Sequence, residues 1–155
     1  AIYFAPNLFV DLTSIVLLVV FLFFSAFFSG CESAFLSINL LKFQTLAKTS
    51  SRAAQVLKLR DQTERLIIIM LIGTNLANIA ATAMVTVIAT KMFGSSGIGI
   101  ATGFMTLLIL IFGEILPKNL AITHATKLTL ATAPIFRFFM VALYPLVILF
   151  ELLSK

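Results

Sequence analysis

Long runs of apolar residues constrain this chain more than any other feature of its sequence. The first run extends over residues 8–41 and contains only two charged residues, Asp11 and Glu32. A helix that crosses a bilayer needs about 20 apolar residues, so this run is long enough for a span and a cytoplasmic extension. The whole chain of 155 residues is 61% hydrophobic and 11% charged, whereas soluble domains are about 45–50% apolar and about 25% charged. We therefore predict an all-α membrane protein, with helix 1 over residues 8–41, and we do not expect an enzyme.

Two further apolar runs predict two more spanning helices. Helix 2 is expected over residues 66–92 and helix 3 over residues 98–112. The third run stops at Gly113 and Glu114, with Pro117 behind them. Because proline has no N–H to donate, we expect helix 3 to end here, as a broken or partly re-entrant helix.

The last apolar segment, residues 134–153, can be read in two ways. It carries Arg137, Tyr144 and Pro145, so it fits either a fourth span or a helix that lies in the cytoplasmic interface with Arg137 and Tyr144 as anchors. The residues alone favour the interfacial helix and leave the fourth span open.

The charged residues indicate how the chain is oriented. The net charge is +5, no Lys or Arg precedes Lys42, and six basic residues lie between Lys42 and Arg65. The positive-inside rule therefore places residues 42–65 in the cytoplasm and the N-terminus outside. The basic residues form no stripe with interleaved aromatics, so we expect no nucleic acid partner. The first residue is not Met, and we expect the native chain to be longer.

Polar residues within the apolar runs are the candidate functional residues, because polar groups at membrane depth are costly. Four serines recur at every fourth position of the first run, so their hydroxyls follow one helical face. They are Ser25, Ser29, Ser33 and Ser37. We interpret the outer two as packing residues that bond to their own backbone. The middle two are stronger candidates, because Gly30 opens the backbone beside them and Glu32 adds an acceptor.

Two further polar groups lie on the second and third runs. Asn75 and Asn78 can both point to one side of helix 2, where they either hydrogen-bond a neighbouring helix or line a cavity. Pro117 leaves the carbonyl of Gly113 without its helical donor, next to the carboxylate of Glu114. A freed carbonyl beside a carboxylate is a natural cation ligand, although a simple helix stop with a snorkelling lysine remains the alternative. Hydroxyl, amide, carbonyl and carboxylate oxygens suit Mg²⁺, Ca²⁺ or Na⁺ rather than zinc or copper.

Three motifs in these segments resemble the CNNM/CorC family of membrane Mg²⁺ transport proteins. The sequence FSGCESAFLS at 28–37 is similar to the family's SG-x-E-[TS]-A element, GTNLAN at 73–78 to G-x-N-x-x-N, and GEILPK at 113–118 to GE-x-x-PK. All three occur in the family's order. Ser33 stands where many members have threonine, and Cys31 stands where serine is common.

The resemblance implies three transmembrane helices with the N-terminus outside, short cytoplasmic-side helices and a juxtamembrane belt helix at residues 134–153. It also implies that residues 1–155 form one transmembrane domain of a homodimer in the cell membrane, as a multi-pass protein of a bacterial inner membrane. The family's ATP-binding CBS domains and its C-terminal domain would lie outside this chain.

For the site, the resemblance implies an intramembrane Mg²⁺ site whose ligands are Ser29, Ser33, Asn78, Gly113 and Glu114. Residues expected to support it are Glu32, Gly30, Gly73, Asn75, Pro117 and Lys118. For Glu32 three roles stay open: a partner of Ser29, a Na⁺ ligand or a packing acceptor. The implied function is export of Mg²⁺ from the cytoplasm, with Na⁺ as the candidate coupling ion. The alternative is a membrane sensor or anchor that binds Mg²⁺ without transporting it.

Two weaker patterns remain. Gly99 and Gly103 have the spacing of a close-packing helix face and could lie in the dimer interface. Residues 28–31 resemble a lipoprotein cleavage box, but the basic segment that precedes such boxes is absent and further spans follow.

Overall fold

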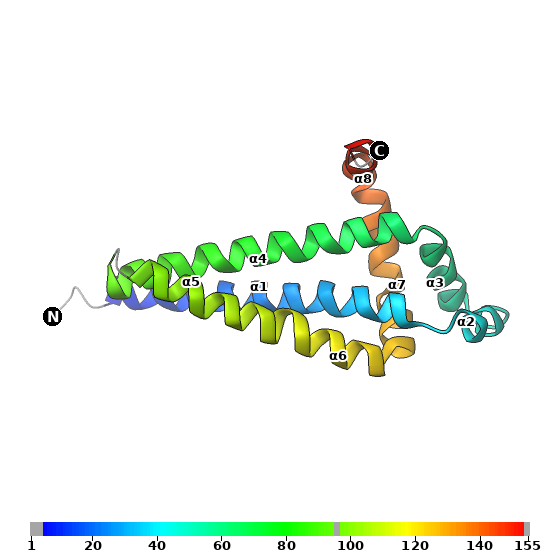
Figure 1. Ribbon diagram of the computed structural model, residues 1–155, viewed down its shortest axis with the longest axis horizontal. Coiled ribbons are helices and arrows are strands. Elements are labelled where there is room, and N and C mark those ends of the chain that lie inside the picture. Colours follow the sequence, from blue (N-terminus) through cyan, green and yellow to red (C-terminus); the bar gives the residue numbers. More distant parts are fainter. Residues whose placement is uncertain (1–4, 95–96, 154–155) are drawn as a thin grey trace.

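The computed structural model describes residues 5–94 and 97–153, and these residues are almost entirely helical. Three long rods run side by side along the long axis of the molecule (Figure 1). The first is α1 (Ala5–Ser37) and the second is α4 (Thr63–Phe93), which runs antiparallel to α1. The helix predicted at 66–92 therefore corresponds to α4.

The third rod consists of three consecutive helical segments. They are α5 (Gly97–Leu108), a π-helical segment η1 (Ile109–Ile115) and α6 (Leu116–Thr123). The sequence predicted that helix 3 ends at residue 112, but the rod continues for another eleven residues. The reason is local: Pro117 lies in the first turn of α6, where its missing N–H costs little, and the N–H of Leu116 bonds the carbonyl of Ile111 in the wider π register.

Two short helices connect the first two rods at one end of the bundle. The predicted helix 8–41 stops at Ser37, because Asn39 adopts an extended conformation and its side chain accepts a hydrogen bond from the N–H of Lys42. This cap begins α2 (Leu40–Leu46). Ser50 then caps α3 (Ser51–Asp61) in the same way.

The C-terminal part differs from the single helix predicted at 134–153. Helix α7 begins earlier, as Ala125–Ala142, and α8 follows as Tyr144–Leu153. The two are separated at Leu143, where Pro145 cannot donate the backbone hydrogen bond that would continue the helix. In Figure 1 α7 lies crosswise to the three rods, near the end that carries α2 and α3.

Phe136 packs α7 against α1. Its ring is fully buried and lies 6.0 Å from the rings of Phe27 and Phe28 and 5.6 Å from that of Phe35, all on α1. Aromatic pairs at such distances each add about 0.5–1.5 kcal/mol beyond their burial. The aromatic cluster therefore holds α7 against the last third of α1.

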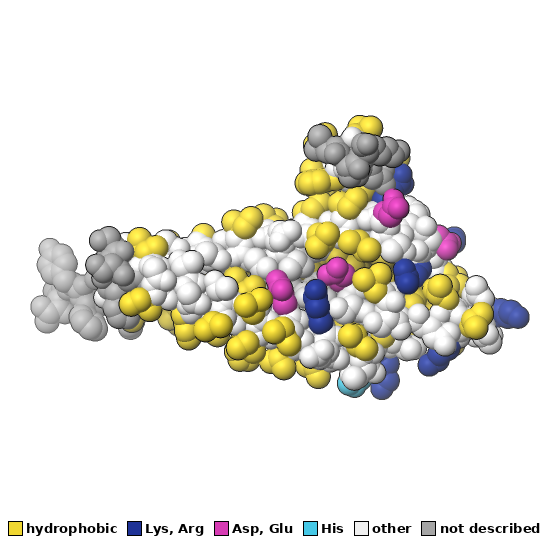
Figure 2. Space-filling view, viewed as in Figure 1, with side chains coloured by type: hydrophobic (Ala, Val, Ile, Leu, Met, Phe, Trp, Pro, Cys, Tyr) yellow, Lys and Arg dark blue, Asp and Glu magenta, His cyan; other side chains and the backbone are white. Residues whose placement is uncertain are grey.

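The surface of the rods is apolar. In the described residues, four helical stretches are long and apolar enough to span a membrane: Leu12–Ser37, Thr63–Met92, Ile98–Thr123 and Ala125–Ala142. Figure 2 shows hydrophobic side chains along the rods, whereas Lys and Arg gather toward the end that carries α2 and α3. The chain is thus an all-helical, multi-pass membrane domain with one basic end.

Candidate functional site

A hydrogen bond between α1 and α4 lies at the centre of the polar cluster. Ser25 on α1 is fully buried, and its hydroxyl donates to Oδ1 of Asn78 over 2.6 Å. The π-helical segment η1 packs closely against Ser25. Gly113 on η1 lies so near that a Cβ atom added to it would be 2.9 Å from the Oγ of Ser25. A hydroxyl, an amide oxygen and a glycine backbone from three helical segments therefore converge here.

Two further hydroxyls, those of Ser29 on α1 and Thr74 on α4, lie one helical turn from Ser25 and Asn78. Because α1 and α4 are antiparallel, the step from Ser25 to Ser29 corresponds to the step from Asn78 to Thr74. Ser29 and Thr74 are 1% and 9% exposed, and the hydroxyl oxygens of both are buried without a hydrogen-bond partner. Buried polar atoms without partners are rare and call for an explanation, and a bound cation or water would provide one.

Close packing of α1 on α4 fixes this register. A Cβ on Gly73 would lie 2.6 Å from the ring of Phe28, which is closer than any real side chain can approach. Glycine is therefore required here so that the two helices can approach each other. Gly73, which the sequence analysis assigned to support of the site, has this packing role.

Gly30 packs against α6 at ordinary van der Waals distances. A Cβ at this position would lie 3.4 Å from the carbonyl oxygen of Pro117 and 3.6 Å from the Cβ of Ala121. Beside it, Glu32 and Lys118 form an ion pair in which Nζ and Oε2 are 3.8 Å apart, and the lysine side chain is 42% exposed. Glu32 thus links α1 to α6, and Lys118 has a carboxylate partner.

The remaining polar residues near this cluster have different surroundings. Asn75 is exposed, because it lies about 60° around α4 from Asn78, on the side opposite to the buried Thr74. Ser33 and Glu114 are half-buried, Ser33 two turns beyond Ser25 on α1 and Glu114 directly after Gly113. Thr82 uses its hydroxyl to bond the carbonyl of Asn78 at 2.8 Å.

Two residues of the cluster lie outside the predicted ligand set. The sequence predicts Ser25 to be a packing residue, and Thr74 is not among the predicted site residues. The four-residue serine spacing contained a signal for Ser25, but it could not tell which serines face Asn78. Thr74 precedes Asn78 by four residues, which places both on one face of a helix, and this spacing was the corresponding signal.

The chemistry of the cluster is that of hard oxygen donors. No group of three or more His, Cys, Asp or Glu side chains that could hold a metal occurs within the described part of the chain. The available donors are hydroxyl, amide and carbonyl oxygens, with Glu114 next to them in sequence. π-Helical turns such as η1 are frequent at functional sites.

The sequence of this chain matches a known family of membrane domains. The family described as cyclin M transmembrane N-terminal domain, CNNM, matches residues 16–155. The chain belongs to the CNNM family. This confirms the resemblance inferred from the three sequence motifs.

Curated CNNM relatives come from several organisms. A UPF0053 protein of Haemophilus influenzae is 36% identical over 144 residues, which cover 92% of this chain and 34% of that protein. The UPF0053 inner membrane protein YfjD of Escherichia coli is 35% identical over 132 residues, which cover 84% of this chain and 31% of YfjD. A polyamine export protein of Haemophilus influenzae is 30% identical over 145 residues, covering 84% of this chain and 34% of that protein. The chain spans about one third of the length of these CNNM relatives.

Proposed function

We propose that this CNNM domain transports Mg²⁺ out of the cytoplasm through the polar cluster between α1, α4 and η1. The observation that carries the proposal is the convergence of Ser25, Asn78 and Gly113 beside the unpartnered hydroxyl of Ser29. Membership of a membrane family that includes a named export protein supports a transport role.

The donor set suits a small, hard cation. Mg²⁺ prefers oxygen ligands at short distances and gives up its water reluctantly, so a site built from neutral oxygens with one nearby carboxylate would bind it weakly. Weak binding is compatible with release on the other side. We propose Ser25, Ser29, Asn78, the carbonyl of Gly113 and the carboxylate of Glu114 as ligands, and Ser33 stays a further ligand implied by the family resemblance.

We propose three spans rather than four, with the N-terminus outside. The crosswise position of α7 supports a belt at the cytoplasmic surface, since a span would lie parallel to the other rods (Figure 1). The basic residues at the end with α2 and α3 support that orientation. α2 and α3 would then be the short helices on the cytoplasmic side.

Three further features of the proposal come from the family resemblance. The domain would act as a homodimer in a bacterial inner membrane, without catalysing a covalent reaction. Na⁺ entering the cell would supply the energy for export. CBS domains outside this chain would bind ATP and regulate it.

The central test is Mg²⁺ flux from proteoliposomes that contain the full-length protein. Asn78→Ala should reduce flux at least about tenfold, because one of roughly five ligands is lost and a tenfold change corresponds to only about 1.4 kcal/mol. Asn75→Ala is the matched control, because it removes the same group from an exposed position of the same helix. Equal flux in wild type and Asn78→Ala would rule out the proposed site.

A Mg²⁺ sensor is the second candidate function, because the same cluster could bind the ion without moving it. Calorimetric titration of Mg²⁺ separates the two functions. Saturable binding that Asn78→Ala removes, in a protein without flux, would favour the sensor.

Polyamine export is a third candidate, which the name of one relative suggests. The complete burial of Ser25 favours a small ion over a long organic cation. Measuring spermidine and Mg²⁺ flux in the same vesicles would decide between them.

A further inference from the structure

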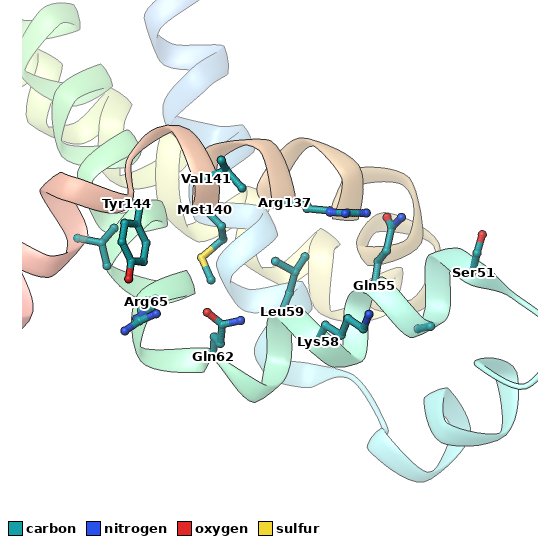
Figure 3. A pocket seen from close by; sticks show the side chains of 12 residues that line it. Ser51, Gln55, Lys58, Leu59, Gln62, Arg65, Arg137, Met140, Val141 and Tyr144 are labelled. Atoms are coloured by element: carbon teal, nitrogen blue, oxygen red, sulfur yellow. The ribbon is translucent and has the colours of Figure 1, made fainter.

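A groove of about 660 Å³ lies between α3, the start of α4 and the junction of α7 with α8. Figure 3 shows its lining, with Gln55 from α3 and Arg137 from α7 extending toward each other from opposite walls. Three basic residues line it, Lys58, Arg65 and Arg137, and none of the described lining residues is acidic. The groove is separate from the polar cluster around Ser25.

The basic residues of the groove have different surroundings. The guanidinium of Arg65 lies over the ring of Tyr144, with its Cζ 5.7 Å from the ring centroid. The side chains of Lys58 and Arg137 make no ion pair with any residue that the structure describes. Two positive charges therefore face the groove without a carboxylate to neutralise them.

The other lining groups are of two kinds. The amide oxygen Oε1 of Gln55 is buried and lacks a hydrogen-bond partner, so it requires a donor. Leu59, Met140 and Val147 give the groove an apolar wall. A ligand that fits must thus combine an anionic group, a hydrogen-bond donor and an apolar part.

The position of the groove indicates which class of such ligands can reach it. It lies at the basic end of the bundle (Figures 1 and 2), which the positive-inside rule assigns to the cytoplasmic membrane surface. Val141, which lines the groove, is 74% exposed, and Phe138 and Leu149 on the same two helices, α7 and α8, are 67% and 53% exposed. Such exposed apolar side chains next to a basic pocket are suited to the border between lipid headgroups and acyl chains.

We propose that this groove binds an anionic phospholipid of the cytoplasmic leaflet, of the phosphatidylglycerol type. Its phosphate lies between Lys58 and Arg137, and a glycerol hydroxyl donates to Oε1 of Gln55. An acyl chain follows the apolar wall past Met140. The lipid would join α3 to α7, and this inference does not depend on which ion the domain transports.

The test is native mass spectrometry of the full-length protein with phosphatidylglycerol and phosphatidylethanolamine of identical acyl chains. The wild type should retain phosphatidylglycerol preferentially. Lys58→Gln with Arg137→Gln should weaken that retention about tenfold or more, because each basic residue near an anionic lipid contributes several-fold to binding. The conservative pair Lys58→Arg with Arg137→Lys should keep it, which separates loss of charge from misfolding.

Lys42→Gln with Lys127→Gln is the matched control, because it removes the same charge from a different pocket at the same end of the molecule. This control should change retention by less than about twofold. An equal loss in both double variants would overturn the proposal in favour of general surface attraction. So would saturable binding of inorganic phosphate with the affinity of the lipid, or the absence of any preference over phosphatidylethanolamine.

Discussion

The hydroxyl of Ser25 donates a hydrogen bond of 2.6 Å to the amide oxygen of Asn78, across the contact between α1 and α4. While it donates, the serine oxygen retains its lone pairs, and the amide oxygen has a second lone pair of its own. Both atoms could thus bind a cation without the hydrogen bond being broken. The pair holds two ligands in place before the ion arrives.

Ser25→Ala should weaken Mg²⁺ binding by about tenfold, because it removes one oxygen ligand and the donor that orients Asn78. Interhelical hydrogen bonds in membranes contribute only about 0.6 kcal/mol on average, so the fold should survive. Calorimetric titration measures the affinity. Ser37→Ala, the same change at an exposed position of α1, is the control. A larger loss from Ser33→Ala than from Ser25→Ala would support the ligand set implied by the family over the one that we propose.

Gly113→Ala should disturb the site without removing any polar group. The added Cβ would lie 2.9 Å from the Oγ of Ser25, so either η1 or the serine must move, at a cost of about 1–3 kcal/mol. We expect a lower melting temperature in detergent and weaker Mg²⁺ binding. In the control, Gly103→Ala, the new Cβ meets nothing within 4 Å in its own chain, so Mg²⁺ binding should stay near the wild-type value. Unchanged binding in Gly113→Ala would show that η1 is not part of the site.

Gly73→Ala should destabilise the packing of α1 on α4, because its Cβ would lie 2.6 Å from the ring of Phe28. Overpacking costs about 1–3 kcal/mol, partly offset by the better helix propensity of alanine, about 1 kcal/mol. In a Phe28→Leu background the same change should be neutral or stabilising. Thermal unfolding of the four proteins in a double-mutant cycle measures the coupling, and independent effects of the two substitutions would contradict the proposed contact.

Glu32→Gln should have little effect on stability, below about 1 kcal/mol, because the ion pair with Lys118 is long and partly exposed. Exchanging the two residues, Glu32→Lys with Lys118→Glu, should restore any stability that Glu32→Gln loses. The melting temperature and the Na⁺ dependence of Mg²⁺ flux are the measurements. A loss of Na⁺ dependence with unchanged stability would instead identify Glu32 as a Na⁺ ligand.

Single-cysteine labelling should determine whether α7 is a belt or a fourth span. With Cys31 replaced by alanine, cysteines at Lys127 and Leu152 bracket α7 and α8. A belt predicts that a membrane-impermeant thiol reagent reaches both from the cytoplasmic side. Labelling of position 152 from the outside alone would demonstrate a fourth span.

Much of this fold could be predicted from sequence because it depends on local chemistry. Apolar runs longer than a bilayer requires must form helices, since lipid offers no partner to an exposed backbone. The end of α1 at Ser37 was harder to locate, because a single cap at Asn39 decides it within an apolar segment. The continuation of the third rod beyond residue 112 was missed, because proline breaks a helix interior but fits a first turn.

The sequence by itself determined that this is a helical membrane domain of the CNNM family, and which segments carry its polar groups. Only the tertiary structure decided that Ser25 and Thr74 belong with Asn78 and Ser29, whereas Asn75 turns away. The physical reason is helix register. Periodicity places residues on a face, but the approach of Gly73 to Phe28 sets how α1 and α4 are aligned. That alignment alone determines which polar groups meet.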